Sequence, residues 1–418
     1  MKIQELHQIF LRSKGVCIDT RKIIKNSIFF ALKGKNFNGN EFAKTALKNG
    51  CNYVVIDERE FQEDERFILV DDVLKYLQQL SNYHRKKLKC PVIGITGTNG
   101  KTTTKELIFA ILNSKYKTVA TQGNLNNHIG VPLTLLSTPL ETEMLIVEMG
   151  ANHPGEINFL SEITQPNFGI ITNIGKAHLE GFGGYEGVIK TKSELYQYIM
   201  KTNGKLFVNS DDDLLLSLSK NSERIKYGKD SQLISANPLL EFNFKNTHIS
   251  TNLIGSYNFY NLALACSVGD FFGVSIDNCK SAIESYIPSN NRSQVERSEK
   301  GNTLILDAYN ANPSSMLVAI QSFEQIKAKK KIAILGDMLE LGDDSLQEHQ
   351  LITEELVKRN FHQVLLVGNE FKQTKNNFLY FENTNQIRTW IQNNPIQNST
   401  VLLKGSRGIR LESLIEFL

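Results

Sequence analysis

The sequence predicts an α/β protein of three domains. A length of 418 residues suggests about two to four domains. Near residue 97 a glycine-rich loop joins a buried strand to a helix, and after residue 300 strands and helices alternate regularly, as in a parallel sheet. We place the domains at residues 1–84, 85–287 and 288–418.

Composition excludes several classes of protein. Hydrophobic residues make up 41% of the chain and charged residues 22%, which is typical of a globular protein. The net charge of +3 is too small to indicate a nucleic-acid or anionic-membrane partner. Five cysteines without C-x-x-C spacing predict reduced thiols, and no apolar run is long enough for a secretory signal or a membrane span. We therefore expect a cytoplasmic protein.

Residues 1–84 are expected to form a small α/β unit, with strands at 27–32 and 53–56 and a helix at 42–49. Polar segments precede and follow the first strand. Loops of this kind can hold polar ligands, but their composition alone indicates only turns and surface charges. The basic cluster at 85–89 is expected to be a solvated linker or helix end.

The most informative segment is the phosphate-binding type of loop that follows a buried strand at residues 92–96. Gly97 and Gly100 leave room for a phosphate to approach backbone N–H groups, and the following helix adds its N-terminal amides. Lys101 provides a charge for the β- and γ-phosphates, and the hydroxyl of Thr102 is a usual Mg²⁺ ligand. A glycine-rich turn that binds nothing is the alternative. The strand, helix and lysine together favour a nucleotide site and a central domain of the P-loop type with a mostly parallel sheet.

Two further strands of this domain end in polar residues. The strand expected within 143–150 ends at Glu148, and the one within 168–175 is followed by His178. Because parallel strands present their carboxyl ends at one edge, both side chains are candidates for metal binding or for orienting water. A helix-cap role for Glu148 and a hydrogen-bonded scaffold role for His178 are the alternatives.

The remaining candidates of the central domain lie on helices. Lys192 is indistinguishable, by spacing alone, from a solvated helical lysine. A helix over 254–265 places Asn258 and Asn261 one turn apart on one face. Two carboxamides there can contact a base, or they can cap a helix start.

Residues 288–418 are expected to form a Rossmann-like, doubly wound domain without a phosphate loop of its own. The predicted strands are 303–308, 331–336, 363–367, 378–381 and 400–404, and the predicted helices are 314–327, 345–359, 385–394 and 408–417. Polar segments at 307–313, 336–342 and 404–408 follow three of these strands. The two large domains are expected to face each other across a cleft.

These motifs together resemble the ATP-dependent Mur ligases of peptidoglycan synthesis, over all three domains. The residues that carry the resemblance are 97–102, Glu148, His178, Asn258, Asn261, Arg292 and Asp307. Segments 172–183, 307–316 and 336–342 are similar to the branch that adds D-alanyl-D-alanine, and the D-N-P-[RK] motif of the branch that adds the third stem residue is not found.

The resemblance implies a role for each site residue. Lys101, Glu148, His178 and Lys192 would be catalytic, and two Mg²⁺ ions would be held by Thr102, Glu148, His178 and a carbamylated Lys192. ATP would contact Gly97, Thr98, Asn99, Gly100, Lys101, Thr102, Thr103, Asn258, Asn261, Arg292 and Asp307. The other substrates would contact Asp19, Thr20, Arg21, Lys33, Gly34, Asn38, Asn126, Asn310 and Asn312.

The resemblance also implies the substrates and the order of events. The N-terminal domain would bind the UDP end of UDP-MurNAc-tripeptide, whose carboxylate would become an acyl phosphate that D-Ala-D-Ala attacks. The protein would be a monomer whose C-terminal domain closes over the central one before chemistry. Two positions depart from the family. Asn38-Gly39-Asn40 stands where many members have Asp-Gly-His, and Tyr257 replaces a frequent His.

Other functions are compatible with parts of the pattern. Another ligase of the same architecture, such as a folylpolyglutamate synthase, is the nearest. A P-loop ATPase that drives conformational work is more distant, because no transporter or helicase signature accompanies the loop. A non-catalytic nucleotide sensor is disfavoured because Lys101, Thr102, Glu148 and His178 are all present. The sequence does not distinguish lysine from diaminopimelate at position three of the stem peptide.

Overall fold

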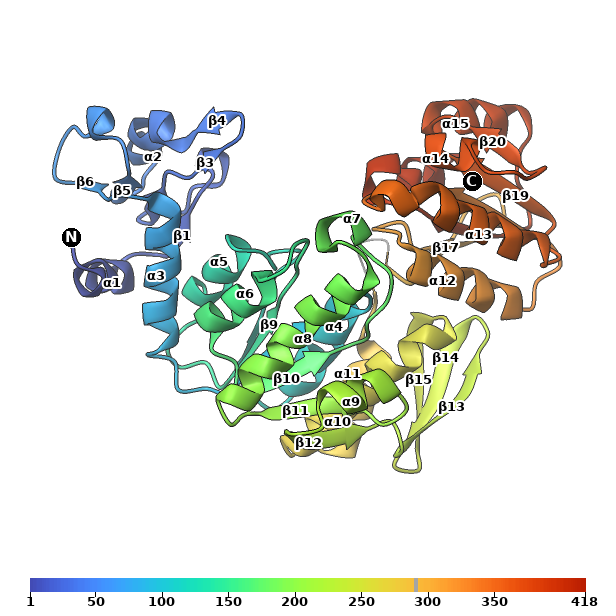
Figure 1. Cartoon of the computed structure of the whole chain (residues 1–418), viewed down its shortest axis with the longest axis horizontal. Helices are drawn as coiled ribbons and strands as arrows, with labels where there is room; N and C mark the ends of the chain where they lie inside the picture. The colour runs from blue at the N-terminus through green and yellow to red at the C-terminus, as the bar shows by residue number, and fades with distance from the viewer. Residues whose placement is uncertain (289–291) are drawn as a thin grey trace.

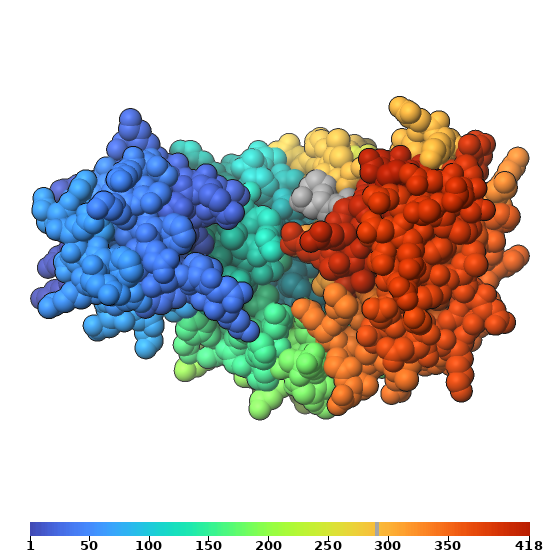
Figure 2. Space-filling model, turned by 90° about the horizontal axis from the view of Figure 1, so that it is seen from above, coloured from blue at the N-terminus to red at the C-terminus, as the bar shows by residue number. Residues whose placement is uncertain are grey.

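The computed structural model describes residues 1–288 and 292–418, which form three α/β domains arranged in chain order (Figure 1). The fold class expected from the sequence is confirmed. In the space-filling view, the N-terminal and C-terminal domains stand on either side of the central domain, part of which is visible between them (Figure 2).

The N-terminal domain has a parallel sheet of four strands in the order β1-β2-β5-β6. The predicted strand 53–56 is β5 (Tyr53–Ile56), and the predicted helix 42–49 is α2 (Ala43–Lys48). The other elements are α1 (Ile3–Arg12), β1 (Val16–Cys17), η1 (Thr20–Lys22), β2 (Ile28–Phe30), β3 (Lys33–Gly34), β4 (Phe37–Asn38), η2 (Gly39–Phe42), η3 (Arg59–Phe61) and β6 (Phe67–Leu69).

Helix α3 (Val73–Arg85) connects this domain to the central one and packs on α5 (Gly130–Leu136) and α6 (Glu156–Thr164) (Figure 1). The basic cluster at 85–89 begins where this helix ends, but Arg85 is buried rather than solvated. Its guanidinium donates to the carbonyls of Thr164 (2.7 Å) and Gln165 (2.8 Å). These groups lie at the C-terminal end of a helix, where carbonyls have no partner within the helix. The prediction of a solvated cluster is therefore wrong at Arg85.

The central domain has a sheet of six parallel strands in the order β12-β11-β10-β7-β9-β8. The predicted strand 92–96 is β7 (Val92–Thr96), which is buried along its whole length between β9 (Met144–Glu148) and β10 (Phe168–Ile171). Burial on both faces explains its continuous apolar sequence. The other elements are α4 (Lys101–Asn113), β8 (Thr118–Ala120), α5 (Gly130–Leu136), α6 (Glu156–Thr164), α7 (Leu179–Phe182), α8 (Tyr185–Lys201), β11 (Lys205–Asn209), α9 (Asp213–Leu218), β12 (Glu223–Tyr227), η4 (Ser256–Asn258), α10 (Phe259–Phe271) and α11 (Ile276–Ser285).

A separate antiparallel sheet of three strands was not predicted. It consists of β13 (Ser231–Ala236), β14 (Leu239–Phe244) and β15 (Thr247–Ile254). In β14, buried Leu240, Phe242 and Phe244 alternate with more exposed residues, which is the pattern of a half-buried strand.

The C-terminal sheet has six strands in the order β16-β17-β21-β18-β19-β20. All neighbours are parallel except β16 (Gln294–Arg297), an edge strand that was not predicted. The expected helix at 408–417 is replaced by two 3-10 segments, because Arg410 between them has a left-handed φ of 60°. The elements are β17 (Thr303–Leu306), α12 (Pro313–Gln325), β18 (Lys331–Gly336), η5 (Gly342–Asp344), α13 (Ser345–Val357), β19 (Gln363–Val367), α14 (Asn369–Lys372), β20 (Leu379–Phe381), α15 (Thr384–Asn393), β21 (Thr400–Lys404), η6 (Arg407–Ile409) and η7 (Leu411–Phe417).

The exact boundaries at 84/85 and 287/288 stay a proposal. Within the part of the chain that the structure describes, no helix is long and apolar enough to cross a membrane.

Candidate active site

A cavity of about 1050 Å³ lies between the central and C-terminal domains. Its central-domain walls are the loop after β7, the end of β9, the loop after β10 and the start of α10. The C-terminal domain contributes side chains that follow β17 and β21, together with Arg292 and Glu340. Because β9 and β10 flank β7 in a parallel sheet, their carboxyl ends converge on the loop between β7 and α4.

The loop after β7 has the backbone that its glycines predict. Gly97 and Gly100 have φ values of 142° and 79°, which favour glycine. A Cβ atom at Gly97 would lie 2.1 Å from Oγ1 of Thr172, so a side chain cannot be accommodated there. The Lys101 ammonium donates to the carbonyls of Gly97 (2.7 Å) and Thr98 (2.9 Å). The loop therefore places a cation at the start of α4, where the first N–H groups of the helix have no partner within the helix, as phosphate binding requires.

Contacts with the end of β10 hold this loop in place. The N–H of Thr98 donates to the carbonyl of Asn173 (2.9 Å), and the N–H of Asn99 donates to Oδ1 of Asn173 (3.0 Å). In return, the Thr172 hydroxyl donates to the carbonyl of Asn99 (2.6 Å). Thr103, on the first turn of α4, also lines the cavity.

Glu148 is 1% exposed at the end of β9. One carboxylate oxygen, Oε1, accepts from the Thr102 hydroxyl (3.2 Å) and from Nδ2 of Asn126 (2.8 Å). The other oxygen, Oε2, is buried without a hydrogen-bond partner and lies 3.9 Å from Nζ of Lys105. A buried carboxylate oxygen without a partner destabilises the folded protein unless a cation binds to it.

These oxygen donors fit Mg²⁺ bound together with nucleotide phosphates. Among the described residues, no three His, Cys, Asp or Glu side chains gather as a metal site on their own. Mg²⁺ ordinarily keeps several waters and uses one or two carboxylates plus substrate phosphates, so the small donor set agrees with a metal that enters with ATP.

His178 lines the same cavity, at the start of α7. Its Nδ1 lies 2.6 Å from Oε2 of Glu340, which belongs to the C-terminal domain. The hydrogen bond from His178 holds the pKa of Glu340 below its usual range.

Lys192 is not a solvated lysine. It is 3% exposed on α8, and its ammonium lies 5.4 Å from the centre of the Phe182 ring. Burial, with a contribution from the charge of Lys101, lowers its pKa to about 7. Much of this amine is therefore neutral near pH 7, which is the form that reacts with CO₂ to give a carbamate.

Asn258 and Asn261 lie next to each other, but the helix begins only after Asn258, so the two residues are not both inside it. Asn258 is the N-cap residue of α10, and Asn261 lies in the first turn. Nδ2 of Asn261 donates to Oδ1 of Asn258 (2.9 Å), while Nδ2 of Asn258 donates to the carbonyl of Ile254 (2.8 Å) and to Oγ of Ser293 (3.0 Å). The oxygen of Asn258 accepts from Asn261, and the oxygen of Asn261 accepts from the Thr104 hydroxyl (3.1 Å). One N–H of Asn261 and one lone pair on each oxygen therefore remain for a ligand.

The C-terminal domain brings four groups to the opposite wall. Arg292 lies over the ring of Tyr309, with Cζ 3.6 Å from the ring centre. Asp307 accepts a hydrogen bond from the ammonium of buried Lys404 (2.6 Å). Lys404 and Tyr309 were not predicted to have roles, although both lie in polar segments that follow strands.

Asn312 joins the two domains across the phosphate loop. It is the N-cap residue of α12, and its Nδ2 donates to Oδ1 of Asn99 (2.8 Å). Nδ2 of Asn99 donates in turn to Oγ of Ser314 (2.9 Å). Asn310 lines the cavity and is exposed.

The chain is similar in sequence to known protein families. The Mur ligase middle domain matches residues 95–269, the Mur ligase glutamate ligase domain matches 291–407, and the Mur ligase family catalytic domain matches 12–85. A UDP-N-acetylmuramoyl-tripeptide–D-alanyl-D-alanine ligase of Bacillus subtilis is 34% identical, over 96% of this chain and 92% of that protein. The corresponding ligase of Escherichia coli is 29% identical, over 99% of this chain and 95% of the relative.

The chain belongs to the Mur ligase family.

Solved structures of Mur ligases have the same three-domain fold. MurF from Acinetobacter baumannii superposes with a TM-score of 0.86 at 29% identity, over 99% of this chain and 97% of that one. MurF ligase from Thermotoga maritima, in complex with ADP, superposes with a TM-score of 0.85 at 27% identity, over 100% of this chain and 98% of that one.

The expected UDP contacts of this Mur ligase lie on the N-terminal domain and do not line the cavity. Arg21 is exposed and pairs with Asp19 (2.8 Å), and Lys33 pairs with Asp57 (2.8 Å) and Glu58 (2.7 Å). Thr20 begins the short helix η1, and Gly34 and Asn38 belong to the hairpin of β3 and β4. These candidates thus lie on the N-terminal domain, and none of them lines the cavity around the phosphate loop.

The two departures from the Mur ligase pattern have local partners. Asn40 is buried and donates to Asp57 (2.9 Å), and the N–H of Asp57 donates back to Oδ1 of Asn40 (3.1 Å). Tyr257 lies beside Asn258, and its hydroxyl is 3.1 Å from Oγ of Ser293. Both residues therefore support the loops that carry the expected ligand contacts.

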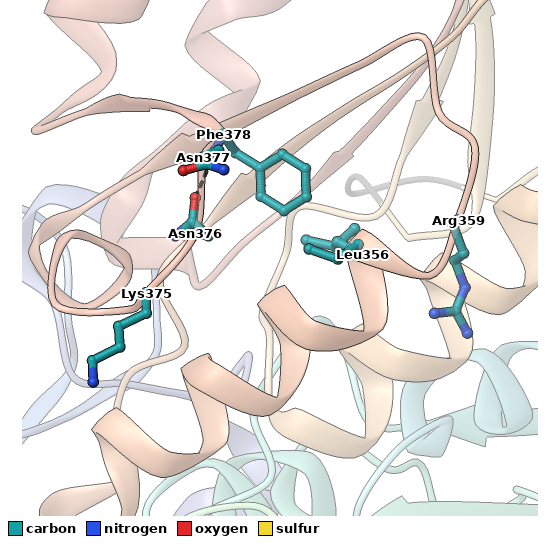
Figure 3. Close-up of a pocket in the computed structure, with 7 residues that line it drawn as sticks. Leu356, Arg359, Lys375, Asn376, Asn377 and Phe378 are labelled. Atoms are coloured by element: carbon teal, nitrogen blue, oxygen red, sulfur yellow. Dashed lines mark hydrogen bonds between the residues drawn. The ribbon is translucent and has the colours of Figure 1, made fainter.

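A second hollow, of about 700 Å³, lies on the outer surface of the C-terminal domain. It is bounded by the end of α13 and the segment before β20, where Leu356 and Phe378 face each other while Lys375 points away (Figure 3). No carboxylate, histidine or cysteine is among the described residues that line it, and it lies outside the candidate active site of this Mur ligase.

Proposed function

We propose that this Mur ligase joins D-alanyl-D-alanine to UDP-N-acetylmuramoyl-tripeptide, with ATP cleaved to ADP and phosphate, in the synthesis of peptidoglycan precursors. The observation that carries the proposal is the similarity to the B. subtilis ligase of this name over nearly the full length of both chains. The cavity between the central and C-terminal domains is the corresponding place for chemistry.

The reaction needs an activated carboxylate, because an amine that attacks a carboxylate directly would have to expel oxide. The γ-phosphoryl group of ATP is transferred to the terminal carboxylate of the tripeptide, which gives an acyl phosphate. The amine of D-Ala-D-Ala then attacks the acyl carbon, and phosphate leaves from a tetrahedral intermediate.

The protein brings two anions together, so positive charge is the first requirement. Lys101 binds the β- and γ-phosphates. To do so, its ammonium leaves the carbonyls of Gly97 and Thr98, which it contacts in the structure. The amides of the loop and of the first turn of α4 surround the same phosphates. Asn258, Asn261, Arg292 and Asp307 hold the adenosine end.

Thr102, Glu148, His178 and a carbamylated Lys192 would hold two Mg²⁺ ions. When bound, Mg²⁺ neutralises phosphate charge and polarises the transferred group. Carbamylation converts the neutral amine of Lys192 and CO₂ into an anion, with release of one proton, and only the anion is suited to a hard cation. The low pKa of Lys192 supports this modification.

The other substrates are assigned by position. Asn126, Asn310 and Asn312 surround the reacting end, while Asp19, Thr20, Arg21, Lys33, Gly34 and Asn38 hold the UDP end. Because these last residues stand on a separate domain, the sugar nucleotide would bridge the N-terminal and central domains. We propose a cytoplasmic monomer, since the reaction consumes ATP and the five cysteines are unpaired.

The test is phosphate release from Mg-ATP with UDP-MurNAc-tripeptide, in the presence and absence of D-Ala-D-Ala, with products identified by mass spectrometry. Release that needs both substrates, with a product of UDP-MurNAc-pentapeptide mass, is expected. Release that is indifferent to both would indicate an ATPase. Activity only with another amino acid would assign the chain to a different branch of the family.

A further inference from the structure

His178 and Glu340 form a hydrogen-bonded pair between two domains. Nδ1 of His178, on the loop before α7, lies 2.6 Å from Oε2 of Glu340, on the loop after β18. Among the described residues, no hydrogen bond engages the other ring nitrogen, Nε2, and the ring lines the main cavity. A carboxylate has no proton to donate near pH 7, so Nδ1 carries the proton of this bond.

Hydrogen bonds at its start hold the loop that carries Glu340. The carboxylate of Asp337 accepts the N–H groups of Glu370 (2.9 Å) and Phe371 (3.0 Å). The N–H of Met338 donates to Nε2 of buried His349 (3.0 Å). The backbone just before Glu340 is therefore held in place by hydrogen bonds, although the side chain of Glu340 is 56% exposed.

The same loop is seated against the helix that follows His178. Gly342 has a left-handed φ of 57°, and a Cβ atom there would lie 3.0 Å from Cβ of Glu180 on α7. A few residues further on, Glu348 of α13 pairs with Lys176 (2.5 Å), two positions before His178. One ion pair, one hydrogen bond from the His178 ring and a close approach to α7 thus join the loop to the residues around His178.

We propose that Glu340 is a positioning residue that orients His178 for the metal, and that the C-terminal domain supplies it only when docked. The proposal rests on the proposed ATP-dependent function. A metal-binding histidine commonly donates its second ring N–H to a carboxylate, which fixes the tautomer and the ring orientation. Here the pair leaves Nε2 with its lone pair free. Because ligand and carboxylate belong to different domains, metal binding and domain docking reinforce each other.

The experiment uses the full-length protein with Mn²⁺ in place of Mg²⁺ and a non-hydrolysable ATP analogue, without peptide substrates. Pulsed EPR detects a histidine nitrogen bound to Mn²⁺, and His178→Ala provides the baseline. In Glu340→Ala we expect this nitrogen coupling to fall toward the baseline, with Mn²⁺ affinity about 10- to 100-fold weaker. Glu340→Gln keeps an acceptor oxygen, so it should retain the coupling.

Two control variants distinguish the orientation of His178 by Glu340 from general contact between the two domains. Glu348→Ala removes the neighbouring interdomain pair but keeps Glu340, and should retain more of the coupling than Glu340→Ala does. Glu241→Ala removes a carboxylate from a surface histidine, His248, and should change nothing. Full coupling and affinity in Glu340→Ala would overturn the inference, as would an equal loss in Glu348→Ala or a wild-type complex without the coupling. A wild type that does not bind the nucleotide analogue would contradict the proposed function itself.

Discussion

At the scale of single residues, the environment of Glu148 shows how one side chain depends on its neighbours. Its carboxylate is buried beside Lys105, which is fully buried and whose ammonium also contacts the carbonyl of Thr121 (2.5 Å) and Glu106 (3.0 Å). Lys105 thus provides a counter-charge beside Glu148, because a buried carboxylate without a counter-charge is strongly destabilising.

Replacing Lys105 by methionine should therefore destabilise the central domain through Glu148. We expect Lys105→Met to lower the free energy of unfolding by about 3–5 kcal/mol. The double variant Lys105→Met/Glu148→Gln should recover much of this loss, since the uncompensated charge is gone. Calorimetry measures the free energy of unfolding of both variants. The control is Lys89→Met, which replaces an exposed lysine before β7. A double variant as unstable as the single one would contradict the explanation.

His7 and His84 form a buried pair between α1 and α3. Nε2 of His84 lies 2.8 Å from the carbonyl of Thr138 and must donate, so its Nδ1 accepts the proton of Nε2 of His7 (3.1 Å). Burial lowers the pKa of both imidazoles, so both rings are neutral near pH 7. Burial, then the proximity of His84 and Lys87, lowers the pKa of His7 to about 4.

This pair predicts a loss of stability in mild acid. An unfolded histidine has a pKa of about 6.5, so the contribution of His7 is complete above that pH and is lost as the pH falls toward 4. Between pH 7 and 4.5 we expect α1 and α3 to lose on the order of 1–2 kcal/mol of protection more in the wild type than in His7→Gln. Hydrogen exchange of their amides measures this difference. An equal loss in both proteins would contradict it.

At the scale of elements, helix α3 is the connection that sets the N-terminal domain on the central one. Three of its side chains donate hydrogen bonds to backbone carbonyls of the central domain: Gln78 to His128, Asn82 to Glu162, and Arg85 to Thr164 and Gln165. Helix-end carbonyls that lose such a donor in a buried place cost about 1–3 kcal/mol each.

Arg85→Met should consequently loosen this junction while the sheets stay intact. We expect a decrease of about 2–4 kcal/mol in the protection of the last turn of α6 against hydrogen exchange. Lys86→Met, at the adjacent exposed position, is the matched control and should have no effect. Unchanged exchange at α6 in Arg85→Met would show that water replaces the guanidinium without loss.

Elements were predictable where their sequence pattern is strong and local. The strands β5, β7, β18, β19 and β21 match the predicted ranges because they are buried β-branched and aliphatic runs in parallel sheets. The sheet of β13, β14 and β15 and the edge strand β16 were missed, since half-buried antiparallel strands obtain their partners from elsewhere in the fold.

At the scale of the whole molecule, the candidate site is divided among the domains. Central and C-terminal residues enclose the cavity, whereas the expected UDP contacts stand on the N-terminal domain, apart from it. The proposed reaction would need all of these around one substrate, and an acyl phosphate would have to be shielded from water.

We therefore expect the domains to close further around bound substrates. The radius of gyration from small-angle X-ray scattering should decrease when an ATP analogue, Mg²⁺ and UDP-MurNAc-tripeptide are added together, and change less with either ligand alone. Identical scattering profiles in all four conditions would contradict domain closure.

The sequence by itself determined the α/β class, the phosphate loop and the order of the candidate residues along the chain. These features depend on local patterns: a buried strand, glycines where φ is positive, and a lysine at a helix start. Only the tertiary structure showed that Lys192 is buried with a lowered pKa, that Lys404 holds Asp307, and that Glu340 meets His178. Burial and pairing between residues far apart in the chain depend on how the domains pack, and no local spacing contains that information.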